Sequence, residues 1–380
     1  MLIGVFLFLL AVAGSLISQN PSYIESGTMQ WLKYLWVLPL IYQFMVDSKA
    51  FIELWCLQIL LILLCFIVFC GVCDAFTSNS YIGPDLTNIC MSTIIAMVSF
   101  SFWRKYGSSL VMKILCVLIV VLGFFLAYYV YFHFLAEASV LDYAYAFRSK
   151  NSMGQILLCC GYIALANYRP KNLLIRCAYY AIILFMFVVM VLMKSRATIV
   201  SGAFVLLYGI LKSKNKKLKL TILSLFVLIL VVVLLNSELY ELIVTGILLA
   251  NREADDMDDL SSGRVVLISD ALESIQENYM VGIGNFYIDC MPIAMILQYG
   301  IIGASIVFFL ISIFGYHIIR KSHGENHLQK PAFLLFFAFL LNSLFEGYPP
   351  FGPGAKCFLM WVMMGFALAE REMKHLQKCK

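Results

Sequence analysis

The chain has 380 residues, of which 62% are hydrophobic and 13% are charged, and its net charge is +5 at pH 7. A soluble protein of this size carries roughly 25% charged residues, so there is too little polar surface here to coat a water-soluble globule. The composition therefore excludes a soluble globular protein and indicates a polytopic membrane protein. The positive net charge does not predict a nucleic-acid partner, because an excess of Lys and Arg in cytoplasmic loops accounts for it.

The first apolar stretch, MLIGVFLFLLAVAGSLIS, has no basic segment before it and no small-residue cleavage site after it. We therefore expect it to be a first membrane span rather than a cleaved signal peptide. Further stretches along the chain are long enough, or nearly so, to cross a hydrocarbon core of about 30 Å. The twelve predicted spans are 2–18, 32–47, 51–70, 87–103, 110–133, 153–168, 174–193, 197–212, 218–235, 291–316, 331–346 and 355–370.

The distribution of Lys and Arg predicts the orientation of the chain. With the N-terminus in the cytoplasm, 19 of the 27 Lys and Arg residues fall on the inner side and 8 on the outer side. Because cytoplasmic loops are enriched in these residues, we expect both termini in the cytoplasm. The predicted fold class is an all-α, polytopic transmembrane helical bundle of about 12 spans. It forms a single integral membrane domain, 1–380, with one large extracytoplasmic loop at 236–290.

Half of the predicted outer cations are arginines, namely Arg148, Arg196, Arg252 and Arg264. Membrane insertion favours Lys and Arg on the cytoplasmic side, so positive charge on the outer face opposes this preference. One explanation is that these residues are retained for another purpose. Snorkelling of long side chains at the membrane interface is the simpler alternative. The segment FRSKNSMGQ, 147–155, brings Arg148 and Asn151 to the outer end of the sixth span.

The stretch MKSRATIVSG, 193–202, forms the tight join between the seventh and eighth predicted spans. Ser195 stands at the outer N-terminus of the eighth span, where serine is a favoured N-cap and the free N–H groups carry partial positive charge. Lys194 and Arg196 add two full charges at the same point. A helix N-terminus beside two cations is suited to bind an anion such as phosphate.

The long outer loop contains SSGRVVLISDALESIQENYMVGIGNFY, 261–287, in which apolar residues recur at helical spacing from Val265 to Ile275. This pattern predicts an amphipathic helix that lies on or dips into the membrane interface, with Arg264 in its first turn. The GIGNF that follows lacks the strand–turn–helix setting that a dinucleotide-binding loop needs.

Two carboxylates lie at the outer ends of late spans. Asp289 is at the mouth of the tenth span, and Glu346 is in FEGYPPFGPG, 345–354, the outer join of the last two spans. A carboxylate at a span mouth is either a cap or arginine partner, or it takes a direct part in chemistry. No metal site is predicted, because the C-x-x-C of Cys70 and Cys73 has no second pair and no nearby histidine.

Four of these segments together resemble the O-antigen ligase / polysaccharide polymerase (Wzy-like) family of bacterial envelopes. SRATIVSG is similar to that family's S-R-small pattern at the start of a span, and SGRVVLISDALESIQENYMVGIGNF is similar to its S-G-R…G-x-G-x-x-F loop. DCMPIAMILQYGIIG resembles a stretch that ends in G-[IL]-x-G, and NSMGQ resembles an N-x-x-G-Q element in an earlier outer loop. The predicted layout of spans around one large outer loop agrees with the resemblance.

The resemblance implies a glycosyltransferase that works on the outer face of the bacterial cytoplasmic (inner) membrane. Its donor would be an oligosaccharide on undecaprenyl pyrophosphate, and an acceptor hydroxyl would attack the anomeric carbon as the lipid pyrophosphate leaves. Cations and a helix N-terminus would stabilise the leaving group without a cofactor or a metal. The family's arginine positions correspond to Arg196 and Arg264. The expected catalytic residues are Asp289, Arg264 and Arg196, and the expected substrate-binding residues are Lys194, Ser195, Arg148, Asn151 and Glu346.

One departure from the family pattern bears on the reaction. The ligase branch has a histidine that opens the stretch before G-x-x-G, and Asp289 occupies that position here. This favours a polymerase, which would join lipid-linked repeat units for a capsule, an exopolysaccharide or an O-antigen. The alternatives are an O-antigen ligase-type transferase and a flippase or transporter for the lipid-linked oligosaccharide. Expected partners are membrane lipids, a flippase and a chain-length regulator.

Overall fold

The computed structural model describes residues 2–136, 150–211, 220, 224, 231–232, 234–241, 243–244, 264–275, 278–319, 327–352 and 357–378. Over these ranges the chain forms helices joined by turns, without a β-strand, which confirms the all-α fold class. The predicted span over 218–235 lies mostly outside the described residues.

In chain order the elements are α1 (Leu2–Ile17), α2 (Pro21–Ser26), the 3₁₀ helix η1 (Gln30–Trp36), α3 (Val37–Val46), α4 (Ser48–Phe51), α5 (Leu54–Phe76), α6 (Pro84–Tyr106), α7 (Ser109–Val130), the π-helix η2 (Tyr131–Leu135), α8 (Lys150–Asn167), α9 (Leu173–Leu192), α10 (Arg196–Leu211), α12 (Ser237–Tyr240), α14 (Arg264–Ser274), α15 (Met291–Ile319), α16 (Gln329–Asn342) and α17 (Phe358–Lys378).

Five of the described helices are long and apolar enough to cross a membrane: α5, α6, α7 continued by η2, α9 and α15. Three shorter apolar helices, α1, α10 and α16, coincide with predicted spans. An α-helix rises 1.5 Å per residue, so these three cover less than a core of about 30 Å. The helices support a membrane protein, whereas the total of about twelve spans stays a prediction.

One predicted span is divided in the structure. Residues 32–47 belong to η1 and then to α3, which begins at Val37. Pro39 lies in the first turn of α3, where proline is tolerated because its missing N–H would have no partner inside the helix. A continuous α-helix from residue 32 would place Pro39 in its interior, where the ring clashes with a backbone carbonyl of the preceding turn. The α-helix therefore starts later than predicted.

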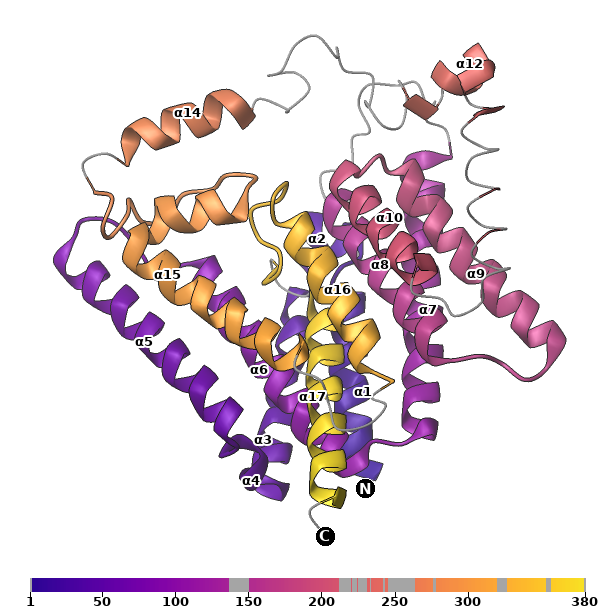
Figure 1. The fold of residues 1–380 in the computed structure, drawn as a ribbon, viewed down its shortest axis with the longest axis horizontal. Coiled ribbons are helices and arrows are strands. Elements are labelled where there is room, and N and C mark those ends of the chain that lie inside the picture. The colour runs from indigo at the N-terminus through magenta and orange to yellow at the C-terminus, as the bar shows by residue number, and fades with distance from the viewer. Residues whose placement is uncertain are drawn as a thin grey trace.

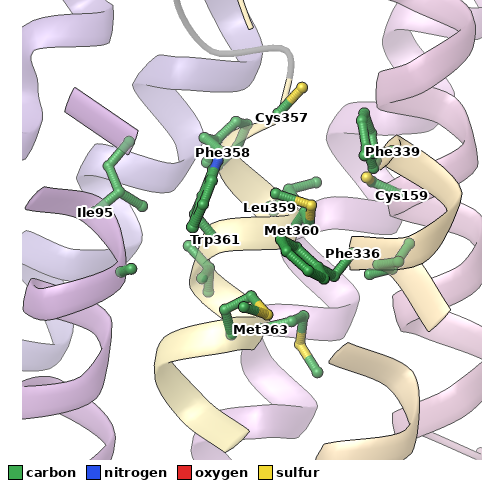
Figure 2. Packing of buried hydrophobic residues seen from close by; sticks show 14 of the residues in the cluster. Ile95, Cys159, Phe336, Phe339, Cys357, Phe358, Leu359, Met360, Trp361 and Met363 are labelled. Carbon is green, nitrogen blue, oxygen red and sulfur yellow. The ribbon is translucent and has the colours of Figure 1, made fainter. Parts of the chain in front are cut away.

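The centre of the molecule is built around α17, which packs most extensively against α6 and also contacts α16 and α8. The side chains of 358–369 are buried on every side of the helix, as expected for a helix that is apolar all round. Figure 2 shows Trp361 and Met363 among side chains from neighbouring helices. Gly365 permits the close approach to α6, because a Cβ there would lie 2.4 Å from the Ala96 carbonyl oxygen.

The two ends of the bundle carry different residues. At one end α1 begins and α17 ends (Figure 1), and Arg104 there pairs with Asp47, Glu53 and Glu372 at 2.7, 2.9 and 3.1 Å. The helix α14, from the predicted outer loop, lies at the opposite end (Figure 1). Residues predicted on opposite faces of the membrane thus lie at opposite ends of the bundle. Which end faces the cytoplasm stays a prediction.

Candidate functional site

The turn between α9 and α10 holds three of the predicted site residues. α10 begins at Arg196, so Ser195 directly precedes the helix. The Ser195 hydroxyl donates a hydrogen bond to the Thr198 hydroxyl (2.8 Å), and both residues are fully buried. Lys194 has a left-handed backbone conformation (φ 53°), which is uncommon for residues other than glycine. Only 3% of Lys194 is exposed, so this turn is enclosed by the protein.

The start of α10 is a positively charged region inside the protein. Lys194 is buried and Arg196 is half-buried, and both lie at the N-terminus of a 16-residue helix. The N–H groups of the first turn add partial positive charge at the same point. A helix N-terminus beside two cations is suited to bind an anion such as phosphate.

A buried polar network joins α8, α10 and α16. The side-chain amide of Gln155 donates to Asn342 Oδ1 (2.9 Å), and the Asn342 amide donates to the Ser201 hydroxyl (3.4 Å). Gly154 allows α8 to lie against α10, because a Cβ there would be 3.2 Å from the Thr198 hydroxyl oxygen. The sequence reasoning missed these network residues. Gln155 and Ser201 lie within the recognised segments NSMGQ and MKSRATIVSG, but Asn342 carried no signal of its own.

A second polar contact joins α8 to the turn after α16. The side-chain amide of Asn151 donates a hydrogen bond to Glu346 Oε1. Glu346 is only 4% exposed, so this carboxylate faces the protein interior. Asn151 and Gln155 are four residues apart on α8 and therefore share one face of that helix. Two of the predicted substrate-binding residues thus come into direct contact, beside the network that reaches α10.

α15 is a discontinuous helix. Gly300 (φ 61°, ψ −172°) divides it into two segments that meet at an angle in Figure 1. Four backbone hydrogen bonds of 2.8–3.2 Å join 279–284 to 297–302 and satisfy groups that the break leaves free. A Cβ at Gly282 would lie 2.5 Å from the Gly300 nitrogen, so the two glycines permit this close contact. The glycines of GIGNF and of QYGIIG therefore fix a helix break.

The first segment of α15 begins beside Glu346. The N–H of Met291 donates to the carbonyls of Ser343 (2.8 Å) and Glu346 (3.1 Å). Asp289, two residues earlier, accepts a hydrogen bond from the Tyr287 hydroxyl. Partial burial, this hydrogen bond and the charges of Asp289 and Glu346 raise the pKa of Tyr287, so its hydroxyl stays neutral and donates. Asp289 and Glu346 thus approach one region from two different elements.

The helix α14 packs on α15. Ile268 and Ile275 contact a small apolar cluster formed with Ile288, Ala294 and Leu297. Leu267 and Leu272 are about half exposed, at 52% and 51%. The position of this helix at a membrane interface stays a prediction.

The structure brings together some of the predicted site residues and leaves others untested. Direct contacts or neighbouring backbone connect Asn151, Glu346 and Asp289, and the buried network links α8 and α16 to the helix that begins at Arg196. Arg148 lies outside the described residues. Arg264 is the first residue of α14, but its side chain lies outside what the structure describes, so its approach to Arg196 stays a prediction.

Comparison with known proteins bears on the same part of the chain. No curated protein matches it. Residues 181–301, about a third of the chain, match a family model described as O-Antigen ligase. This segment runs from α9 through the cationic turn and α10 to Ile301, directly after the break in α15. The resemblance inferred from the sequence motifs is therefore confirmed for residues 181–301, an O-antigen ligase-type segment within a membrane protein.

Proposed function

We propose that the chain is a polysaccharide polymerase, a glycosyltransferase that joins undecaprenyl-pyrophosphate-linked repeat units on the outer face of the cytoplasmic membrane. The observation that carries this proposal is the pair of cations, Lys194 and Arg196, at the enclosed start of α10. The family match supports the proposal because residues 181–301 include this turn. The carboxylates Asp289 and Glu346 supply the acceptors that sugar hydroxyls need.

The proposed reaction needs a site for a departing pyrophosphate. An acceptor hydroxyl oxygen forms a bond to the anomeric carbon of the donor sugar, and the bond from that carbon to the pyrophosphate oxygen breaks. The electron pair leaves with the lipid pyrophosphate, on which negative charge therefore grows in the transition state. Preorganised cations and helix N–H groups stabilise such charge. In this scheme Arg196, Lys194 and Ser195 bind the pyrophosphate, and Arg264 contributes from α14.

The proton of the acceptor hydroxyl needs a base, and Asp289 has this function in the proposal. The Tyr287 hydroxyl hydrogen-bonds to Asp289 and so fixes the orientation of its carboxylate. Arg148, Asn151 and Glu346 bind the sugars of the donor or acceptor. An aspartate in place of the histidine of the ligase branch favours the polymerase reaction over transfer to another lipid acceptor.

The proposal includes the membrane arrangement predicted from the sequence. The chain would have about twelve spans, with both termini in the cytoplasm and the loop 236–290 outside. A flippase would deliver its substrate to the outer face, and a chain-length regulator would act on its product. No cofactor or metal takes part in the scheme.

Deletion of the coding sequence, followed by sizing of lipid-linked glycan, tests the proposal. A polymerase predicts that single lipid-linked repeat units accumulate on the outer face. Long unattached chains would instead identify a ligase, and intermediates trapped in the cytoplasmic leaflet would identify a flippase. Complementation with the wild-type chain, and with Arg196→Ala as the matched inactive form, ties the result to the cationic turn.

A further inference from the structure

We infer that Tyr287 and Tyr348 form a binding platform for a sugar ring of the acceptor glycan, with Asp289 at its edge. The inference rests on the proposed function, which requires an acceptor hydroxyl beside Asp289. It adds two residues to the site and gives the chemical class of their ligand, a pyranose ring that stacks on a tyrosine and hydrogen-bonds to a carboxylate.

The two rings contact one another in a tilted arrangement, and both remain partly accessible. Their centroids are 5.1 Å apart and their planes differ by 36°. Tyr287 is 54% exposed and Tyr348 is half-buried, so the pair presents an aromatic surface rather than packing into the core. The Tyr287 hydroxyl points to Asp289, to which it donates a hydrogen bond. A carboxylate therefore borders the aromatic surface directly.

Backbone contacts fix the two tyrosines relative to one another, although they are 61 positions apart in the sequence. The Met291 N–H reaches the carbonyls of Ser343 and Glu346, which joins the start of α15 to the turn after α16. Gly347 makes this crossing possible, because a Cβ at that position would lie 2.5 Å from the Ile288 carbonyl oxygen. The platform is thus formed by two backbone segments that cross one another, before α15 and after α16, and does not depend on a single loop.

The chain beneath Tyr348 is anchored in the core. The N–H of Phe351 donates to the Tyr348 carbonyl (2.9 Å), and the Phe351 ring stacks on Trp361 with centroids 5.6 Å apart. The indole N–H of Trp361 donates to the Pro350 carbonyl (2.8 Å), and the Ser92 hydroxyl donates to the Phe351 carbonyl (3.0 Å). Trp361 is the central residue of the packing in Figure 2. The backbone that carries Tyr348 is therefore anchored, which lowers the entropic cost of binding a ligand.

Aromatic rings bordered by carboxylates match the chemistry of a sugar. A pyranose has an apolar face of C–H groups, which packs on the electron-rich face of a tyrosine, and a rim of hydroxyls, which donate to carboxylate oxygens. The charges of both Asp289 and Glu346 act on the Tyr287 hydroxyl. Negative charge here would repel a pyrophosphate, which belongs beside Lys194 and Arg196. The site thus separates a sugar-binding part from an anion-binding part.

A binding experiment on the purified full-length chain in detergent tests the inference. The probe is the delipidated repeat-unit oligosaccharide, released by mild acid from the lipid-linked glycan of the source bacterium. We expect it to bind the wild-type chain with saturation transfer from aromatic protons, and we expect Tyr287→Leu and Tyr348→Leu to weaken binding at least 10-fold. Tyr287→Phe and Tyr348→Phe retain the rings and should stay within about 3-fold of wild type.

The matched control is Tyr279→Leu, which removes a tyrosine of similar exposure (53%) from the same outer segment and should leave oligosaccharide affinity unchanged. Farnesyl pyrophosphate serves as a second probe, which should lose affinity in Arg196→Ala and retain it in both leucine variants. Oligosaccharide binding that is absent, or that persists in both leucine variants, overturns the platform, and the tyrosines are then interfacial aromatic residues. Pyrophosphate binding that is absent from the wild-type chain, or unchanged in Arg196→Ala, contradicts the proposed anion site and leaves the platform standing.

Discussion

The side-chain amide of Asn151 donates a hydrogen bond to the carboxylate of Glu346 across 195 positions of sequence. This contact joins the first turn of α8 to the turn after α16. A second hydrogen bond joins Gln155, further along α8, to Asn342 at the end of α16. Because the same network reaches Ser201 on α10, the cationic turn and the buried carboxylate are positioned by one set of contacts.

Asn151→Ala should impair activity because it removes a donor from a buried carboxylate, a loss that costs about 1–3 kcal/mol. We expect chain elongation by the purified protein, measured with lipid-linked repeat units, to fall at least 10-fold. Asn172→Ala is the matched control: it removes the cap of α9, whose side chain accepts from Leu174 and Ile175 N–H, and costs about 1 kcal/mol away from the site. Equal activity losses in the two variants would contradict a local function of Asn151.

Arg196 should be the cation whose loss reduces activity most. Removal of one preorganised donor to a developing oxyanion typically lowers a rate about 10²–10³-fold, and we expect a loss of that size in Arg196→Ala. Arg196→Lys should fall between Arg196→Ala and wild type, because lysine keeps the charge but lacks the planar fork that binds phosphate oxygens. Lys33→Ala, which removes a cation at the predicted outer end of span 32–47, should elongate chains at the wild-type rate. An active Arg196→Ala chain would refute the pyrophosphate site.

Substitutions in the buried network should destabilise the chain to different degrees, with the larger loss where the shorter hydrogen bond is broken. Asn342→Ala breaks the 2.9 Å bond from Gln155 and leaves that amide unsatisfied, which should destabilise the chain by about 1–3 kcal/mol. Ser201→Ala breaks only the 3.4 Å contact with Asn342 and a local bond to the Ala197 carbonyl, so its effect should be smaller. Thermal unfolding of the purified variants in detergent measures which substitution destabilises the chain more. A larger effect of Ser201→Ala than of Asn342→Ala would contradict this order and show that the Gln155 amide finds another acceptor when Asn342 is removed.

The glycines at the break in α15 should be intolerant of alanine. At Gly300 the positive φ with an extended ψ costs about 1–3 kcal/mol for any residue with a side chain, and a Cβ would lie 2.2 Å from the Met280 carbonyl oxygen. Gly282→Ala should be similarly damaging, because its Cβ would meet the backbone of 298–300. Gly71→Ala in α5 is the control: its Cβ meets nothing within 4 Å, so the helix should be stabilised by about 1 kcal/mol. Yield and thermal stability of the purified variants check all three.

The sequence predicted much of the helix layout because apolar runs end at recognisable signals. The spans predicted at 174–193 and 197–212 agree with α9 and α10 within one residue at each end, where the Lys-Ser-Arg turn interrupts the apolar run. The break at Gly300 was not predictable, since QYGIIG continues an apolar pattern and the break depends on hydrogen bonds from 279–284. Such a partner segment is a tertiary feature that local periodicity does not contain.

The candidate site was predicted in pieces but not as an assembly. The segments around Asn151, Arg196, Asp289 and Glu346 were each recognised from charge and position at span ends. Their mutual contacts depend on how α8, α10 and α16 pack, and sequence spacing gives no information on this. Tyr287 and Tyr348 were not assigned to the site, because an aromatic residue at a span end is also typical of the membrane interface. Tertiary contacts distinguish them, namely the ring contact between the two tyrosines and the close approach of backbone at Gly347.

The ion cluster at the opposite end of the bundle predicts a pH-dependent stability. Glu372 lies two residues beyond the predicted span 355–370, and burial together with the charge of Glu53 raises its pKa from 4.5 to about 7, although Arg104 opposes this. A carboxyl whose pKa is raised holds its proton more tightly in the folded chain, so stability falls as the pH rises from about 4.5 to 7.

Glu372→Gln removes that penalty, while Arg104 keeps its ion pairs with Asp47 and Glu53. We expect the variant to match wild type near pH 5 and to exceed its stability at pH 8 by on the order of 1–3 kcal/mol. Thermal unfolding of both proteins from pH 5 to pH 8 measures this difference. The same pH dependence in wild type and Glu372→Gln would contradict the effect of Glu372.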